Sequence, residues 1–304
     1  MTRNKKELHS IVLLVLATAF WGSTFAFTKA LTNAYLPIDL ITIRFLITAL
    51  MMFFIFHRSI MTTYVHLKKH VLFYLIILGV LNFFAIYLQT LGLTEIAATN
   101  SGFITSLSVL FVPLVEYVFL KKTIMKRTGI AIVVSLVGIY LMSFGFALPT
   151  QFVPGDTLTL ISAMLYGFFI ILVGYLSKQI PSAPLMFTVF LITSVVSFCA
   201  SLFLSDDFLS PQFFTQFLDP MILFNWGFLI IFGTIISYVF MGLGQKNLDS
   251  QTSALIYILE PVFATVIAVF FFGETFFLYK IIGAFLILMS QVGASRGDSR
   301  IAPT

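Results

Sequence analysis

Apolar stretches of about twenty residues recur along the chain, separated by short polar connections. A helix needs about this length to cross the roughly 30 Å of hydrocarbon in a bilayer. We find such windows at residues 10–31, 37–56, 70–92, 97–120, 127–146, 155–178, 183–204, 222–244, 250–272 and 277–295. They lack the alternating pattern of barrel strands. The pattern therefore predicts an all-α integral membrane protein with ten transmembrane helices.

The amino-acid composition also indicates a membrane protein. Hydrophobic residues make up 60% of the 304 residues and charged residues 10%, and 37 residues are phenylalanine. Soluble domains contain about 45–50% apolar and about 25% charged residues. The N-terminal RNKK and the apolar window after it could mimic a signal peptide. That window is too long and lacks a clear small-residue cleavage site, so it is interpreted as the first span.

Basic residues are unequally distributed between the two sides of the predicted bundle. All 17 lysines and arginines except Lys29, Arg44 and Lys280 lie at the termini or in alternate connections. The opposite connections contain Asp and Glu but no Lys or Arg. Cytoplasmic loops are enriched in Lys and Arg, which predicts that both termini are cytoplasmic. This bias explains the net charge of +5 without a nucleic-acid partner. No metal site or cofactor is indicated, and the lone Cys199 cannot form an intrachain disulfide.

The two halves of the chain resemble each other. A shift of 152 residues places Ser101 on Ser253 and Ile104 on Ile256. We therefore expect two five-helix units, residues 1–148 and 149–304. Because five is odd, the second unit enters the membrane from the opposite side, and the units are inverted repeats. Many transporters use this arrangement to alternate access to a central site.

Four sequence motifs indicate a family. FWGSTF, IRFLITA, NSGFITSLSVLFVP and LEPVFATVIAVFFFGE resemble segments of EamA-type carriers in the drug/metabolite transporter superfamily. The resemblance covers nearly the whole chain and implies a basket of ten helices that moves amino acids, other metabolites or drugs, often outward. One departure is that Lys121-Lys122 stand where the first repeat commonly has a Gly-Glu pair. Glu274 keeps the corresponding glutamate of the second repeat.

Glu260 and Pro261 are unusual because they lie about halfway along an apolar span. A charged side chain near the bilayer centre is costly and usually faces the bundle interior or water. Pro261 leaves the carbonyl of Tyr257 without its helical hydrogen-bond donor. Helix kinks are expected at Pro113 and Pro261. Glu260 is the candidate for substrate binding or ion coupling; the alternative is that it only bonds a neighbouring helix.

Other polar and aromatic residues are candidates for lining a substrate cavity. Residues 253, 257 and 260 share one helix face, and the repeat relates Thr105 and Ser108 to the last two of them. Polar residues also share faces of the third and eighth spans, and the repeat relates an aromatic residue of span 1 to one of span 6. The predicted cavity residues are Trp21, Arg44, Asn82, Gln89, Thr105, Ser108, Tyr166, Tyr238, Tyr257 and Glu260. Helix packing is the alternative role for each of them.

Arg44 is the main cation within the predicted spans. Its guanidinium would suit a carboxylate or phosphate group of a substrate. The alternatives are that its side chain extends to the outer membrane surface or pairs with Asp39. The sequence leaves these three possibilities open.

The candidate residues favour transport over catalysis. The chain has no Walker-type loop and no H-E-x-x-H motif, so neither an ATP-driven transporter nor a membrane metalloprotease is indicated. The expected function is a secondary transporter of small organic metabolites, such as amino acids or related polar compounds, that exports them across the inner or plasma membrane. The alternatives are an exporter of drugs or lipophilic compounds and a non-transporting receptor. The expected partners are a small-molecule substrate and the lipid bilayer, and the expected assembly is a monomer or a homodimer.

Overall fold

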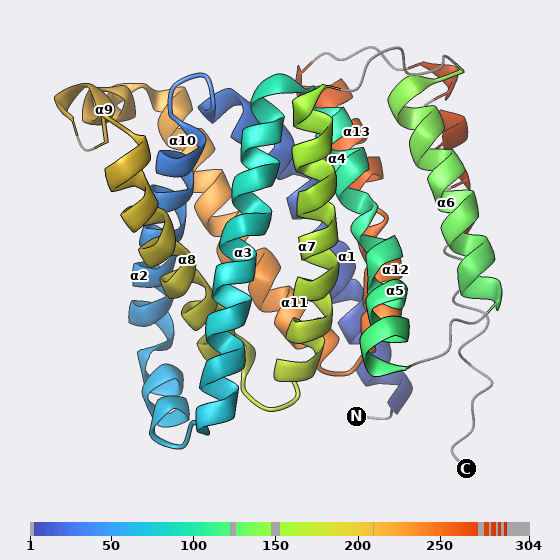
Figure 1. Cartoon of the computed structure of the whole chain (residues 1–304), viewed down its shortest axis with the longest axis horizontal. Coiled ribbons are helices and arrows are strands. Elements are labelled where there is room, and N and C mark those ends of the chain that lie inside the picture. Colours follow the sequence, from blue (N-terminus) through green and yellow to red (C-terminus); the bar gives the residue numbers. More distant parts are fainter. Residues whose placement is uncertain are drawn as a thin grey trace.

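All regular secondary structure in the described part of the chain is helical. The computed structural model describes residues 3–121, 126–146, 153–208, 210–272, 277–279, 281–283, 285–286 and 289–290. Its α-helices (Figure 1) are α1 (Arg3–Leu31), α2 (Pro37–Val65), α3 (Lys69–Glu95), α4 (Ala98–Ser106), α5 (Ser108–Leu120), α6 (Lys126–Phe144), α7 (Pro154–Leu176), α8 (Ser182–Leu204), α9 (Pro211–Thr215), α10 (Pro220–Ile230), α11 (Ser237–Gln245), α12 (Ser250–Tyr257) and α13 (Glu260–Phe272). A 3₁₀ turn, η1 (Gln216–Leu218), follows α9, and a π-helix, η2 (Ile231–Ile236), joins α10 to α11.

Eight helical segments are long and apolar enough to cross a membrane. They are Lys5–Leu31, Pro37–Val65, Lys69–Glu95, Ala98–Val118, Pro154–Leu176, Ser182–Leu204, Pro220–Gln245 and Ser250–Ile267. Large apolar side chains such as Phe54, Phe203 and Phe270 are 74%, 88% and 79% exposed on the outside of the bundle, where lipid would cover them. The chain is therefore a multi-pass membrane protein.

The remaining two predicted spans differ from these eight. The window 127–146 corresponds to α6, in which the apolar stretch Gly129–Gly138 is shorter than a full span. The window 277–295 is described only in short pieces, and Glu274 and Lys280 lie outside the described residues. Ten spans and cytoplasmic termini consequently stay predictions.

One predicted boundary is wrong because an apolar window does not detect a polar helical extension. The second span was expected to end at residue 56, but α2 has a non-helical Phe56 (φ −115°, ψ 18°) and continues to Val65 through polar residues. The connection near 205–221 contains α9 and η1. Ser210 begins α9, since its hydroxyl accepts a hydrogen bond from the backbone N–H of Phe213 at 3.1 Å.

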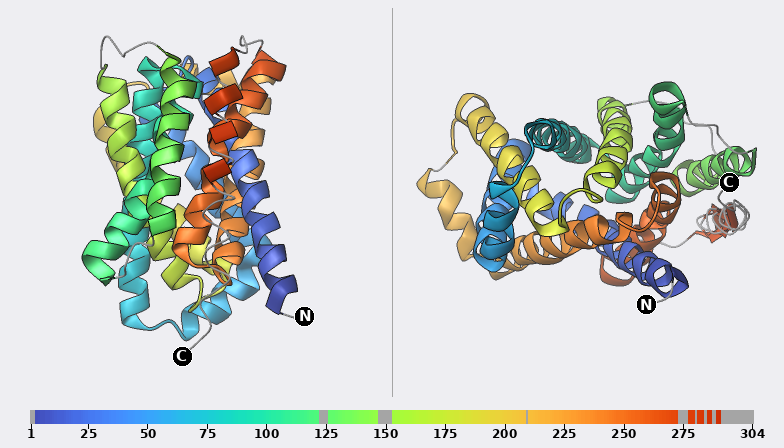
Figure 2. Two further views of the ribbon diagram at one scale, coloured as in Figure 1. Left: turned by 90° about the vertical axis from the view of Figure 1, so that its right-hand side faces the viewer. Right: turned by 90° about the horizontal axis from the view of Figure 1, so that it is seen from below.

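The helices form a single bundle with its long axes roughly parallel (Figure 1, Figure 2). α2 packs along α8, and α3 packs along α7. α1 contacts both α11 and α13, and α6 lies at the edge of the bundle in Figure 1. The centre of the bundle is therefore bounded by α1, α3, α7, α11 and the α12–α13 pair.

Gly22 allows α1 to approach the backbone of α13. A Cβ atom added at Gly22 would lie 2.6 Å from the carbonyl oxygen of Glu260 and 2.8 Å from the backbone nitrogen of Ala264. Small residues commonly permit such close helix contacts in membranes. The two backbones therefore touch directly beside Trp21 and Glu260, which brings these two side chains to the same region of the bundle.

Two of the membrane-crossing segments are interrupted near their middle. α4 gives way to α5 at Leu107, and α12 gives way to α13 at residues 258–259. Each break uses i→i+3 hydrogen bonds, from the N–H of Leu107 to the carbonyl of Ile104 (3.1 Å) and from the N–H of Leu259 to the carbonyl of Ile256 (3.1 Å). The 152-residue shift places one break on the other.

The prolines lie differently relative to the two breaks. Pro261 follows the second break directly, whereas Pro113 lies inside α5, beyond the first break. Proline is well tolerated in the first turn of a helix, where its missing N–H has no helical acceptor. The break at Leu107 therefore has no proline beside it to indicate it in the sequence.

Lys29 connects the end of α1 to the end of α3. Its Nζ donates hydrogen bonds to the carbonyls of Leu93 (2.5 Å), Thr94 (3.0 Å) and Ile96 (3.2 Å), where a helix C-terminus attracts cations. We expect Lys29→Met to lower the free energy of unfolding by about 1–3 kcal/mol, because these charged hydrogen bonds are lost. Thermal unfolding of the purified protein in detergent would measure this. Lys178→Met, at an exposed position in the connection after α7, is the matched control; equal losses for the two variants would contradict the prediction.

Candidate functional site

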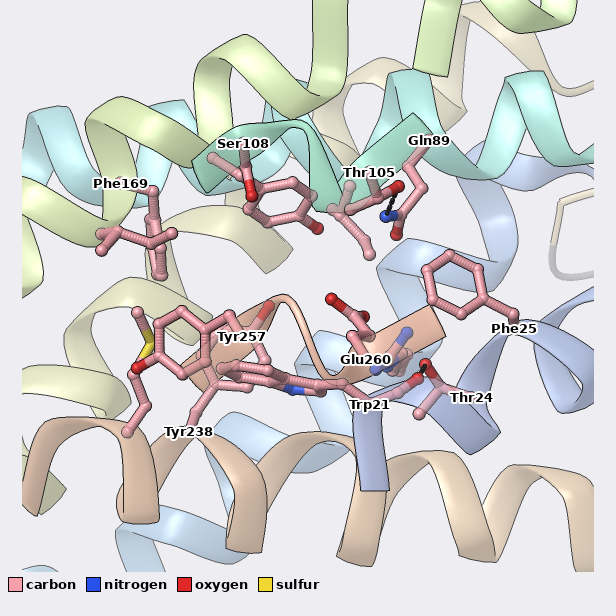
Figure 3. Close-up of a pocket in the computed structure, with 15 residues that line it drawn as sticks. Trp21, Thr24, Phe25, Gln89, Thr105, Ser108, Phe169, Tyr238, Tyr257 and Glu260 are labelled. Atoms are coloured by element: carbon pink, nitrogen blue, oxygen red, sulfur yellow. Dashed lines mark hydrogen bonds between the residues drawn. The ribbon is translucent and has the colours of Figure 1, made fainter. Parts of the chain in front are cut away.

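A pocket lies inside the bundle (Figure 3). Its walls come from α1, α2, α3, α4, α5, α7, α11, α12 and α13. Nine of the ten predicted cavity residues line it: Trp21, Arg44, Gln89, Thr105, Ser108, Tyr166, Tyr238, Tyr257 and Glu260. The pocket thus brings together residues from both halves of the sequence.

Six further lining residues were missed by sequence reasoning: Thr24, Phe25, Ile86, Phe169, Ile170 and Met241. Each lies three or four positions from a predicted residue on the same helix, and therefore on the same helix face. Helical spacing from the predicted residues would have found them. Most are apolar, so residue type alone does not distinguish them from lipid-facing neighbours in the sequence.

Glu260 is the first residue of α13 and follows the break in the ninth predicted span. Its carboxylate points into the pocket (Figure 3), and within the described residues it makes no hydrogen bond or ion pair. The N-terminus of a helix has unpaired N–H groups and favours negative charge. The Glu-Pro pair thus begins a helix inside the membrane and leaves a carboxylate facing the cavity.

Aromatic rings form one side of the pocket. The ring centroid of Trp21 lies 5.2 Å from that of Tyr238 and 5.5 Å from that of Tyr257, both with edge-on geometry. The indole Nε1 of Trp21 and the hydroxyl of Tyr257 are buried without a hydrogen-bond partner among the described residues. Buried polar groups are normally hydrogen-bonded, so these two groups lack the partner that such groups usually have.

Polar groups occupy the other side of the pocket. The Nε2 of Gln89 donates a hydrogen bond to Oγ1 of Thr105 at 2.9 Å, and Ser108 adds a hydroxyl nearby (Figure 3). Thr105 lies in the last turn of α4, near the break at Leu107, and Ser108 begins α5. Both broken segments therefore contribute polar groups to the same pocket.

Arg44 is held by the π-helix between α10 and α11. Its Nε donates to Oγ1 of Thr234 at 2.8 Å, and its Nη2 donates to the carbonyl of Gly233 at 3.2 Å. Arg44 is only 3% exposed, so its side chain does not reach the membrane surface. The alternative of pairing with Asp39 is also wrong, since that carboxylate accepts a hydrogen bond from Ser205 at 2.6 Å and makes none with Arg44.

Asn82 is the predicted cavity residue that does not line the pocket. Its Nδ2 donates to Oγ1 of Thr193 at 3.0 Å, and its Oδ1 accepts from the hydroxyl of Tyr238 at 3.4 Å. It thus lies behind Tyr238 and joins α3, α8 and α11. An amide in an apolar bundle must be paired, but the pairing here is between helices.

Comparisons with known proteins agree with this architecture. The chain is 27% identical over 287 residues to an "Uncharacterized transporter" of Archaeoglobus fulgidus, covering 94% of this chain and 86% of that protein. It is 24% identical over 308 residues to "Uncharacterized transporter YyaM" of Bacillus subtilis, covering 95% and 94% of the two chains. A solved structure described as "Crystal structure of protein" shares the fold, with a TM-score of 0.75 at 16% identity over 97% of this chain and 99% of that one.

The family comparison confirms the resemblance noted in the sequence motifs. The model of the EamA-like transporter family matches residues 8–144 and again residues 153–296. These two matches cover nearly all of the sequence and meet close to the boundary expected between the two five-helix units. The chain belongs to the EamA-like transporter family.

Proposed function

We propose that the protein is a secondary carrier that moves small organic metabolites, such as amino acids or related polar compounds, out of the cell by alternating access. The observation that carries the proposal is the carboxylate of Glu260, which faces a central pocket without a partner among the described residues. Ionisable groups within membrane spans usually serve a substrate or ion pathway. Transporter sites also often use the N-terminus of a broken helix near the bilayer midplane.

The chemistry of the pocket suits a small organic molecule with polar ends. Aromatic rings provide flat apolar contacts, and a few hydroxyl, amide and charged groups can fix the orientation of a ligand. One carboxylate, Glu260, and one guanidinium, Arg44, line the pocket, so its formal charges balance. An acidic group of a ligand would complement Arg44, and Glu260 is the group in the pocket that can exchange a proton.

The two helix breaks support alternating access. Because α4–α5 and α12–α13 are each interrupted beside the pocket, the half-helices on either side can tilt separately. The half-helices nearer one membrane surface could then open while the other half-helices stay closed. In the two-repeat arrangement expected from the sequence, the same motion would be available on both sides.

Substrate counterflow in proteoliposomes tests this proposal. Vesicles would be loaded with amino acids, nucleosides, polyamines or organic acids, and uptake of the same labelled compound would be followed. A carrier gives saturable, trans-stimulated accumulation of one class, whereas a channel gives none against the gradient. The absence of accumulation across the panel, with protein shown to be folded, would contradict the metabolite-carrier proposal and favour lipophilic substrates or a receptor.

A further inference from the structure

Arg44 lines the pocket, and its two hydrogen bonds use only part of its guanidinium. A guanidinium has five N–H donors in a fixed plane. The protein uses Nε, bound to Thr234, and Nη2, bound to Gly233, which together form the side edge of the group. The terminal edge, formed by Nη1 and the second hydrogen of Nη2, is not needed for these two bonds. Two parallel N–H groups on one edge match the two oxygens of a carboxylate.

The π-helical turn is shaped to hold this side chain. The hydroxyls of Thr234 and Ser237 each donate to the carbonyl five residues earlier, at Leu229 and Phe232, as expected for a π turn. Gly233 has no side chain, and a Cβ atom there would lie 2.5 Å from Cγ2 of Thr24. π turns occur frequently at functional sites. The local backbone thus fixes one edge of Arg44 and limits the directions in which the other edge can point.

The charge of Arg44 has no counter-ion among the described residues. Within the described residues no carboxylate lies within ion-pair distance of it, although it is buried and Glu260 lines the same pocket. A buried charge without a partner is costly. An anionic ligand group at the terminal edge would reduce that cost.

From this geometry we infer that the terminal edge of Arg44 is an oxyanion subsite that binds a carboxylate of the molecule occupying the pocket. The inference rests on the proposed role of this pocket as the substrate site. It assigns Arg44 to substrate recognition, and it assigns Thr234 and Gly233 to the positioning of Arg44. The subsite distinguishes carboxylates from neutral amides, because only the former offers two negatively charged acceptors.

Ligand-induced thermal stabilisation of the purified, full-length protein tests the subsite. The probes are phenylalanine, leucine and serine, each compared with its C-terminal amide. We expect at least one amino acid to stabilise the wild-type protein at a concentration at least about tenfold below that needed for its amide. Arg44→Gln should reduce this preference to less than about threefold, whereas Arg58→Gln, at an exposed position on the same helix, should keep it.

A second variant addresses the possibility that Arg44→Gln does not fold. Thr234→Val keeps the guanidinium but removes the acceptor of its Nε, so the preference for the carboxylate should fall by about tenfold while the amide is bound as before. Equal stabilisation by acids and amides in the wild type, or a preference that survives in both variants, would overturn the subsite. So would the absence of binding by every carboxylate probe.

The two proposals can fail separately. The counterflow panel includes nucleosides and polyamines, which carry no carboxylate. Accumulation of these compounds without binding of any amino acid would support the carrier proposal and contradict the carboxylate subsite. Carboxylate-selective binding that depends on Arg44, together with no counterflow of any compound, would support the carboxylate subsite and contradict the carrier proposal.

Discussion

Glu260→Gln is expected to abolish substrate accumulation driven by a pH gradient while leaving counterflow of the same substrate within about threefold of the wild type, because glutamine keeps the shape and polarity of the side chain. A carboxyl group that faces the pocket can exchange a proton with water entering from either side, whereas a neutral amide cannot. The absence of any other carboxylate among the described residues that line the pocket makes Glu260 the candidate for this exchange.

The size of the effect follows from the energy stored in the gradient. A difference of about two pH units stores about 2.7 kcal/mol per proton and can sustain about a hundredfold accumulation if one proton is coupled to each substrate molecule. The measurement is uptake into proteoliposomes under a pH difference of either sign. Glu116→Gln is the matched control, since Glu116 is a buried acid outside the pocket whose carboxylate accepts a hydrogen bond from Gln251 at 2.7 Å.

Three outcomes separate the roles of Glu260. Retention of pH-driven accumulation in Glu260→Gln would rule out proton coupling through this residue. Loss of both accumulation and counterflow, in protein that remains folded, would assign Glu260 to substrate binding instead. Loss of accumulation alone would support the coupling role.

Gly22→Ala is expected to lower the free energy of unfolding by about 1–3 kcal/mol and to reduce transport strongly. The added methyl group would lie 2.6 Å from the carbonyl oxygen of Glu260 and 2.9 Å from Cβ of Phe263, and these atoms belong to the α13 backbone or its immediate attachment. No flexible side chain can move aside, so α1 and α13 must separate. Both Trp21 and Glu260 would shift with them.

Gly227→Ala provides the control for Gly22→Ala. A Cβ atom added at Gly227, inside α10, would meet nothing within 4 Å. Replacing a mid-helix glycine by alanine without a clash should raise stability by about 0.5–1 kcal/mol. Thermal unfolding and counterflow of the two variants would be compared. An unchanged melting temperature and unchanged transport for Gly22→Ala would show that the α1–α13 contact is less tight than the structure indicates.

Much of the fold could be predicted because lipid imposes a simple pattern on the sequence. Eight of the ten apolar windows correspond to helices long enough to cross the membrane, and the membrane-protein class followed from composition. The polar extension of α2 beyond Phe56 was missed because its residues are no more apolar than a loop. The break at Leu107 was missed because no proline lies there and the hydroxyl residues around it are also common within membrane helices.

The candidate pocket was predictable for a related reason. Polar and aromatic residues stand out in apolar helices, and nine of them meet in one cavity. The contact between Arg44 and the π-helix could not be predicted, because it joins residues 190 positions apart in the sequence. The placement of Asn82 behind Tyr238 similarly depends on the packing of three helices, which no helix-face pattern specifies.

The π-helix also adds one extra residue to a helical turn within a membrane span. Rewinding η2 into α-helical geometry would remove one residue's worth of turn, rotating α11 by about 100° and moving it by about 1.5 Å relative to α10. Tyr238 lies just beyond η2, so this rotation would take its ring out of the pocket and change the packing of α11 on α1 and α8. Distances between spin labels on α10 and α11, compared with and without ligand, would detect such a rotation. Because η2 holds Arg44, a ligand that binds Arg44 would thereby favour one of two rotations of α11 relative to α10.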